Sequence, residues 1–148
     1  MDLSKVKDVL RNLIRTARDG EKGYQDAGEH VKRSDLKTYF QEQSAERGKF
    51  ARQLETELSG LGEQAEGEGG SVSAAMHRAW IDLKSNLGAD DHSILASVEQ
   101  GEDNAKDAYD EALKEPIPAP ILAIIRVQAQ SVRAAHDRVK SLRDSMAA

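Results

Sequence analysis

Apolar residues recur in this chain at alternating intervals of three and four positions, in four separate stretches. The first stretch, from Leu3 to Val31, and the last, from Ile121 to Met146, keep this spacing with few polar interruptions. A period of 3.5 residues places the apolar side chains along one side of a helix, where they face partner helices. We therefore predict an all-α fold, built as a four-helix bundle. Its helices are expected over residues 4–31, 35–60, 91–115 and 119–146.

The connections between these helices predict their directions. Residues 32–34 form a short loop, and residues 115–120 contain all three prolines of the chain, so each of these connections joins two antiparallel helices. The segment 62–90 is long enough to run the roughly 40 Å height of the bundle. We predict that it is a partly helical crossover, which makes helices two and three parallel and the order up-down-down-up. The whole chain, residues 1–148, is then one domain.

Residues with helix-starting preferences stand at the predicted boundaries. Ser4, Ser34 and either Asp90 or Asp91 are expected N-caps, because a short side-chain oxygen accepts a hydrogen bond from a free backbone N–H. Pro120 fits the first turn of the last helix.

His77 and Trp80 lie about one turn apart in residues 71–84, the short amphipathic helix expected within the crossover. We expect Trp80, the only tryptophan, to anchor the crossover against the side of the bundle. The alternative is that the two residues form a small binding surface.

The composition excludes several classes of function. A net charge of −5 offers no basic face for nucleic acid, and the absence of cysteine excludes disulfides, thiolate metal sites and cysteine nucleophiles. The chain has no run of apolar residues long enough to span a membrane, and its first residues lack the apolar segment of a secretory signal. We predict a cytoplasmic protein that binds neither nucleic acid nor membrane, and we leave open a homodimer and an unidentified protein partner.

Ionisable residues from all four helices fall at nearly the same depth in the predicted bundle. Each lies ten or eleven residues below the upper end of its helix. Glu102 occupies a core position of the apolar repeat, as Arg47 does, and the others flank core positions. The predicted layer consists of Glu21, Glu46, Glu102 and His136, with Glu99 as a substitute for Glu102.

Buried carboxylates need positive charge or hydrogen bonds beside them. One solution is a metal ion, since oxygen and imidazole ligands suit iron, manganese or zinc. The other is a metal-free polar core in which Arg47 pairs with Glu21 and Glu102. Both solutions remain open from the sequence. We expect no resident cofactor, with iron or manganese as the alternative.

Three inward carboxylates and a histidine at one depth on four helices, together with a long crossover, resemble the ferritin-like superfamily over nearly the whole chain. Three segments are also similar to a bacterial family of hypothetical four-helix-bundle proteins, classed as a domain of unknown function. These segments are DGEKGY at residues 19–24, HRAWIDLK at 77–84 and EQGED at 99–103. The resemblance implies a bundle fold and brings no activity with it.

Ferritin-like di-iron proteins bind metal through one Glu from each of two helices and a Glu-x-x-His pair from each of the other two. The matching positions in this chain are Glu21, Glu46, Glu99 or Glu102, and His136. Lys49 stands where the histidine of the second-helix pair would be, and Arg133 stands where the carboxylate partner of His136 would be. The resemblance therefore implies a degraded site that lacks part of its ligand set.

The resulting interpretation is a ferritin-like bundle protein of unknown activity with a degraded carboxylate and histidine site in its core. One alternative is a non-haem iron- or manganese-binding protein with a reduced site. The other is a helical interaction or stress-response module. No catalytic residue is predicted, and the sequence leaves open whether the protein is an enzyme.

Overall fold

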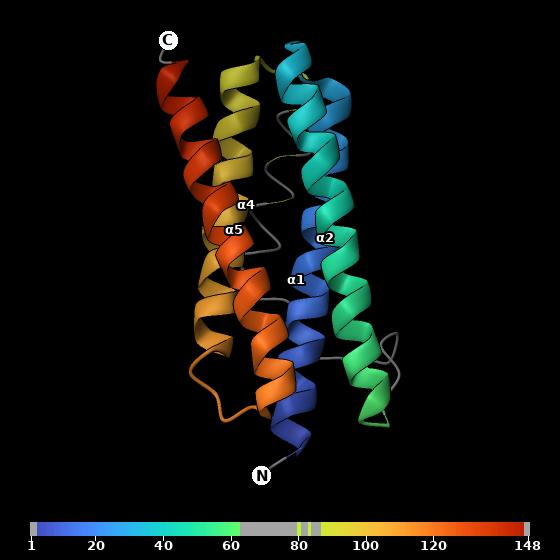
Figure 1. Ribbon diagram of the computed structural model, residues 1–148. Helices are drawn as coiled ribbons and strands as arrows, with labels where there is room; N and C mark the ends of the chain where they lie inside the picture. The colour runs from blue at the N-terminus through green and yellow to red at the C-terminus, as the bar shows by residue number, and fades with distance from the viewer. Residues whose placement is uncertain (1–2, 63–79, 81–82, 84–86, 147–148) are drawn as a thin grey trace.

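The computed structural model describes residues 3–62, 80, 83 and 87–146, and four long helices lie within them (Figure 1). The helices are α1 (Leu3–His30), α2 (Ser34–Gly60), α4 (Asp91–Ala112) and α5 (Ala119–Ser145). Their bounds confirm the predicted all-α four-helix bundle. The largest difference from the predicted bounds is at the end of α4. The sequence predicts that this helix reaches residue 115, but it ends at Ala112, with Leu113 as its C-cap.

The helix directions match the predicted order. In Figure 1, α1 and α5 run upward while α2 and α4 run downward, so the bundle is up-down-down-up and α2 is parallel to α4. Apart from Trp80 and Leu83, residues 63–86 lie outside the described residues. The predictions of a short helix over 71–84 and of a role for His77 fall there.

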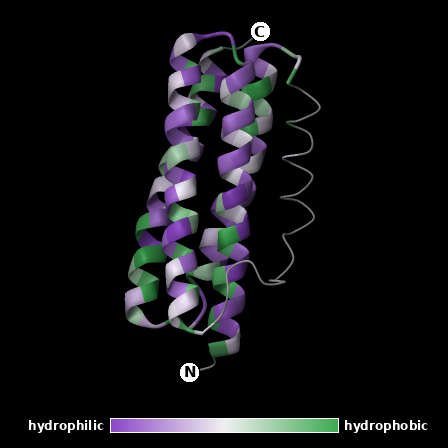
Figure 2. Ribbon diagram, turned by 90° about the vertical axis from the view of Figure 1, so that its right-hand side faces the viewer, coloured by the Kyte–Doolittle hydropathy of each residue, from purple (hydrophilic) through white to green (hydrophobic). Residues whose placement is uncertain are grey.

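Each helix contacts two neighbours. α1 packs against α2 and α4, and α5 packs against α4 and α2, so that α2 and α4 face each other diagonally across the bundle. Figure 2 shows hydrophilic and hydrophobic stretches interleaved along every helix, as expected for amphipathic helices with one buried side. None of the described helices is both long and apolar enough to cross a membrane.

The buried apolar residues form two clusters, one above the other. The lower cluster includes Leu10, Leu54 and Ile125, and the upper one includes Phe40 and Ile94. These positions belong to the apolar repeats of the sequence, which therefore face the core as predicted.

Leu3 is an exception to the predicted core. Its side chain is 47% exposed, because α1 begins at this residue and extends below the ends of the other helices (Figure 1).

Two aspartates at the start of α4 have different roles. Asp90 is the N-cap, and its carboxylate accepts a 2.9 Å hydrogen bond from the backbone N–H of Ser93. Asp91 instead accepts hydrogen bonds from the backbone N–H groups of Lys32, at 2.8 Å, and Arg33, at 3.0 Å. Asp91 thereby ties the start of α4 to the loop between α1 and α2.

The two serine caps predicted from the sequence are wrong. Arg33 is the N-cap residue of α2, in an extended conformation and without a side-chain cap, and Ser34 is the first residue inside the helix. The hydrogen bond from Arg33 to Asp91 holds the chain extended at that point. Ser4 likewise lies inside α1. Pro120 does lie in the first turn of α5, as predicted.

Candidate functional site

A buried ion pair crosses the core diagonally from α2 to α4. Arg47 donates hydrogen bonds of 2.7 and 2.6 Å from Nη1 and Nη2 to the two carboxylate oxygens of Glu102. The side chains are 2% and 0% exposed. Burial alone would lower the pKa of Arg47, but the carboxylate of Glu102 outweighs burial and raises it above its ordinary value. The two parallel contacts have the bidentate geometry of a guanidinium and a carboxylate, so the two side chains form an ion pair.

Arg47 fits into the core because α1 presents a glycine to it. A Cβ atom at Gly20 would lie only 3.1 Å from Arg47 Nη1, so a larger residue there would press on the ion pair. On the same helix, the Tyr24 ring lies 5.4 Å from the guanidinium carbon, measured to the ring centroid. At this distance the ring face attracts the cation.

A second polar group joins three helices below the ion pair. Gln128 of α5 accepts a 2.8 Å hydrogen bond from the Tyr109 hydroxyl of α4. Its amide nitrogen donates to Gln53 Oε1 at 3.0 Å and to the Phe50 carbonyl at 3.3 Å, both on α2. Gln128 is thus a buried polar residue whose side chain is hydrogen-bonded at both ends, as burial requires.

All three tyrosines of the chain lie near these charges. Burial raises the pKa of Tyr24, Tyr39 and Tyr109, and the negative charge of Glu102 raises each further, while Arg47 opposes the shift. For Tyr39 the pKa rises to about 12. The Tyr24 hydroxyl is buried and has no hydrogen-bond partner in the structure as far as it is described. The tyrosines are therefore neutral groups around a charged pair.

Glu21 does not reach this ion pair. Its Oε1 accepts a 2.9 Å hydrogen bond from Arg18, which also binds Glu55 at 2.9 Å. The other carboxylate oxygen of Glu21 lies against Gly48, where a Cβ atom would overlap it. Of the two ion pairs predicted for Arg47, the one with Glu102 is thus confirmed and the one with Glu21 is wrong, because Glu21 is held at the α1–α2 surface.

Glu46 and Glu99 also have partners of their own. Ser131 of α5 donates a hydrogen bond to Glu46 Oε1. Glu99 Oε1 lies 3.0 Å from Nε of Arg143. The first contact joins α2 to α5 and the second joins α4 to α5, so these two carboxylates point to different faces of the bundle.

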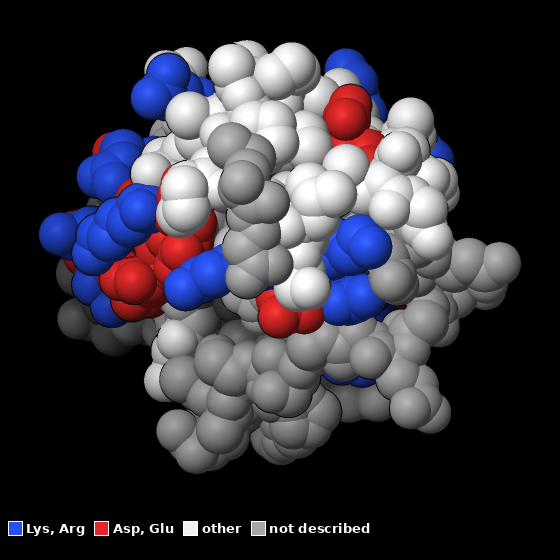
Figure 3. Space-filling view, turned by 90° about the horizontal axis from the view of Figure 1, so that it is seen from below, with Lys and Arg blue, Asp and Glu red and all other residues white. Residues whose placement is uncertain are grey.

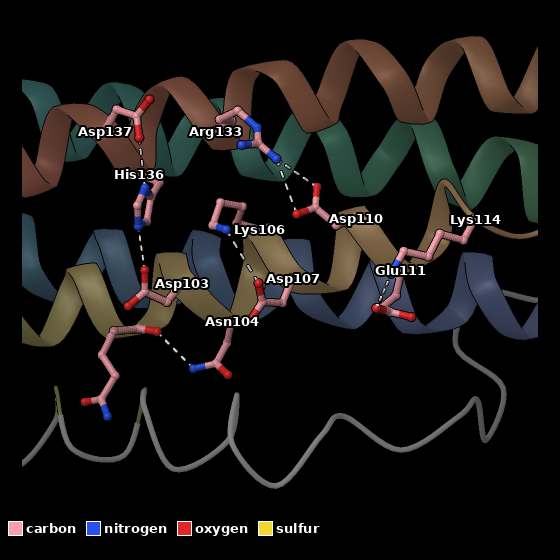
Figure 4. Close-up of polar contacts among 11 residues, drawn as sticks. Asp103, Asn104, Lys106, Asp107, Asp110, Glu111, Lys114, Arg133, His136 and Asp137 are labelled. Atoms are coloured by element: carbon pink, nitrogen blue, oxygen red, sulfur yellow. Dashed lines mark hydrogen bonds and ion pairs between the residues drawn. The ribbon is translucent and has the colours of Figure 1, made fainter.

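His136 lies on the outer side of the α4–α5 pair, between two aspartates (Figure 4). Its Nε2 is 2.5 Å from Asp103 on α4, and its Nδ1 is 3.0 Å from the neighbouring Asp137. One turn away, Arg133 binds Asp110 at 3.1 Å, again from α5 to α4. Basic residues of α5 thus face acidic residues of α4 along this side.

Among the residues that the structure describes, no three of the His, Asp and Glu side chains are grouped so that they could hold one metal ion. The four predicted ligands each contact different partners, and both oxygens of the Glu102 carboxylate accept hydrogen bonds from the guanidinium of Arg47. Whether the protein takes up metal in solution stays a prediction, tested below.

We expect the stabilising contribution of His136 to decrease as pH rises. Burial lowers the pKa of His136, but its hydrogen bonds with Asp137 and Asp103 outweigh burial and raise the pKa above the ordinary value of 6.5. The folded protein then binds this proton more tightly than the unfolded chain. The stabilisation is complete below the unfolded pKa of about 6.5 and is lost as pH rises through the folded pKa.

Urea unfolding of the wild type and of His136→Gln, from about pH 5 to pH 9, measures this contribution. The wild type should be more stable than His136→Gln at low pH, and this difference in unfolding free energy should decrease as pH rises. His30→Gln is the matched control, since His30 is exposed and bonds a carbonyl of its own helix. A difference for His136→Gln that stays constant over the range would contradict the expectation.

Trp80 packs on the face shared by α1 and α4. A Cβ atom at Gly101 of α4 would lie 2.5 Å from the indole ring, and one at Gly23 of α1 would overlap it. Of the described residues, Trp80 alone packs against both apolar clusters. The prediction that Trp80 packs against the side of the bundle is confirmed.

The role of the two glycines was missed from the sequence, although a signal was present. Gly23 and Gly101 lie inside long helices, where glycine is less favourable than alanine by about 1 kcal/mol. An interior helical glycine usually marks a close approach of another group. Gly23, Trp80 and Gly101 belong to the three segments 19–24, 77–84 and 99–103 of the sequence, and these three residues meet here.

Residues 5–115 match the model of a family described as a domain of unknown function, DUF2383. The match spans most of the chain, including nearly all of α1 and the whole of α2 and α4, and the chain belongs to this family. No curated protein matches the chain. The Arg47–Glu102 pair, Trp80 and both glycines lie within the matched residues.

Proposed function

We propose that this protein is a ferritin-like bundle that works without a metal in its core, and that it acts as a helical interaction module through its outer faces. Support for the ferritin-like assignment comes from the connectivity: two antiparallel hairpins joined by one long crossover, with the second and third long helices parallel. This is the topology of ferritin-like folds. We place the protein in the bacterial cytoplasm, on the basis of the sequence resemblance and the acidic, cysteine-free composition.

The observation that carries the proposal is the bidentate pairing of Arg47 with Glu102. Both carboxylate oxygens of Glu102, which is 0% exposed, are bound to a cation that is part of the chain. A divalent metal would have to displace this guanidinium and lose its own water shell. The two positive charges would also repel each other at a few ångströms. The ion pair therefore takes the place that a metal has in other ferritin-like bundles.

Charge on the outside supports an interaction role over nucleic-acid binding. On the end of the bundle shown in Figure 3, acidic and basic side chains of the described residues lie interspersed. A nucleic-acid surface would gather Lys and Arg on one face. Mixed charge of this kind suits a protein partner or a second copy of the chain, and sedimentation velocity distinguishes a homodimer from a monomer.

Metal uptake tests the metal-free core. The protein is purified without chelator and incubated with ferrous iron or with manganese, and bound metal and oxygen consumption are then measured. We expect far less than one metal per chain and no rapid oxidation of iron. Two tightly bound irons per chain with fast oxygen consumption would overturn the proposal.

Site variants separate the alternative of a reduced metal site. One bound metal that is lost in both Glu102→Ala and His136→Ala would support that alternative. Asp107→Ala is the matched control, because Asp107 is an exposed carboxylate on α4. Metal that is lost equally in the control would be bound at the surface.

A further inference from the structure

The face between α1 and α4 contains a narrow groove that an aromatic ring fills. Its walls are the backbones at Gly23 and Gly101, which lie so close to the Trp80 ring that neither position has room for a methyl group. The Tyr24 ring lies beside the indole, 6.4 Å between centroids and tilted by 57°. Tilted aromatic pairs at this separation attract each other. The groove is therefore shaped for a flat ring.

We propose that Gly23, Gly101 and Tyr24 form a binding slot for one indole-sized aromatic ring, which Trp80 occupies from within the same chain. The class of ligand follows from the geometry. A flat ring lies against two backbones without side chains, whereas an aliphatic group of equal volume is thicker and would meet both. The slot thus accepts a free indole when the Trp80 ring is absent.

The slot lies at the level of the buried polar residues of the core. Gly101 precedes Glu102 in α4, and Gly23 precedes Tyr24, whose ring contacts the guanidinium of Arg47. Trp80 also packs against the apolar clusters on both sides of this polar layer. A ring in the slot therefore covers the level of the bundle where the buried charges lie, and an empty slot would admit water toward them.

Replacement of Trp80 followed by addition of free indole tests the proposal. Trp80→Gly should lower the melting temperature, and indole should raise it again in a saturable manner. The expected rise is roughly 4–8 °C when indole is at ten to a hundred times its dissociation constant. The wild type should not respond, because its slot is filled. Cyclohexanol at the same concentration is the aliphatic control and should have little effect.

A second substitution in the same variant locates the binding. In Trp80→Gly combined with Gly101→Ala, the added methyl group occupies the slot, and indole should no longer raise the melting temperature. Gly28→Ala is the matched control, since a Cβ there meets only ordinary contacts of 3.4 Å or more, and rescue should persist. Rescue that survives Gly101→Ala, or no rescue of a folded Trp80→Gly, would overturn the proposal.

A measurement on the otherwise native chain covers the case in which Trp80→Gly does not fold. Trp80 is the only tryptophan, so its fluorescence reports whether the slot holds the ring. Gly23→Ala and Gly101→Ala should each shift the emission to the red and increase quenching by acrylamide, because the methyl group displaces the indole into water. Gly28→Ala should leave both unchanged. Unchanged emission in both slot variants would refute the slot.

Discussion

Arg47→Met should lower the free energy of unfolding by about 3–5 kcal/mol, the range found when one partner of a buried ion pair is removed. Methionine has a similar length and fills much of the space beside Gly20, so little of the loss comes from a cavity. The main cause is the carboxylate of Glu102, which is 0% exposed and would have no cation in the described core. Denaturant unfolding monitored by circular dichroism measures the change.

The double variant tests whether the two charges act together. Arg47→Met combined with Glu102→Leu removes both charges and leaves no stranded group, so its cost should be much smaller than the sum of the two single changes. A coupling energy of about 2 kcal/mol or more is expected in the cycle. Additive costs would mean that the two side chains do not interact in solution.

An ion pair at the surface provides a reference for the coupling energy of the buried pair. Arg18 and Glu55 form a 2.9 Å ion pair between α1 and α2, with side chains that are partly exposed. The same cycle with Arg18→Met and Glu55→Leu should give a coupling energy of about 1 kcal/mol or less, since water and salt screen exposed charges. The comparison separates the effect of burial from that of pairing.

Gln128→Leu should be the next most costly change, with a loss of about 2–3 kcal/mol. Leucine has nearly the volume of glutamine, so the packing is preserved. The Tyr109 hydroxyl, however, loses the acceptor to which it donates at 2.8 Å, and an unsatisfied buried hydroxyl costs about 1–3 kcal/mol. The hydrogen bond from Gln128 to Gln53 of α2 is lost as well.

Two further variants of the same region check that cause. Tyr109→Phe in the Gln128→Leu background should recover part of the stability, because it removes the stranded hydroxyl. Gln130→Leu, at an exposed position of α5, should change the stability by no more than about 0.5 kcal/mol. A Gln128→Leu variant as stable as Gln130→Leu would show that the buried hydrogen bonds contribute little.

The apolar repeat determined the architecture by itself. A spacing of 3.5 residues sustained over nearly 30 positions leaves a helix as the only structure that buries those side chains together. The short loop predicted at residues 32–34, the prolines at 116–120 and the length of the crossover then predict the directions of α1, α2, α4 and α5. These features are local or depend on chain length, so no knowledge of tertiary contacts was needed.

The repeat also identified the polar positions of the core without deciding their partners. Arg47 and Glu102 could be placed in the core from their register alone. The sequence places Glu21 and His136 at the same depth of the bundle, but depth does not fix the direction of a side chain around the helix axis. In the structure, Glu21 accepts a hydrogen bond from Arg18 at the α1–α2 surface, and His136 is hydrogen-bonded to Asp103 on the outer side of α4.

Only the tertiary structure decided which residues meet across the bundle. Arg47 can extend into the core because Gly20 has no side chain. The Trp80 ring can pack between α1 and α4 because Gly23 and Gly101, on these two helices, have none. Such contacts are set by the rotation of each helix about its own axis and by the distance between neighbouring axes. The periodicity of a sequence defines which side of a helix is buried, and packing alone defines what that side touches.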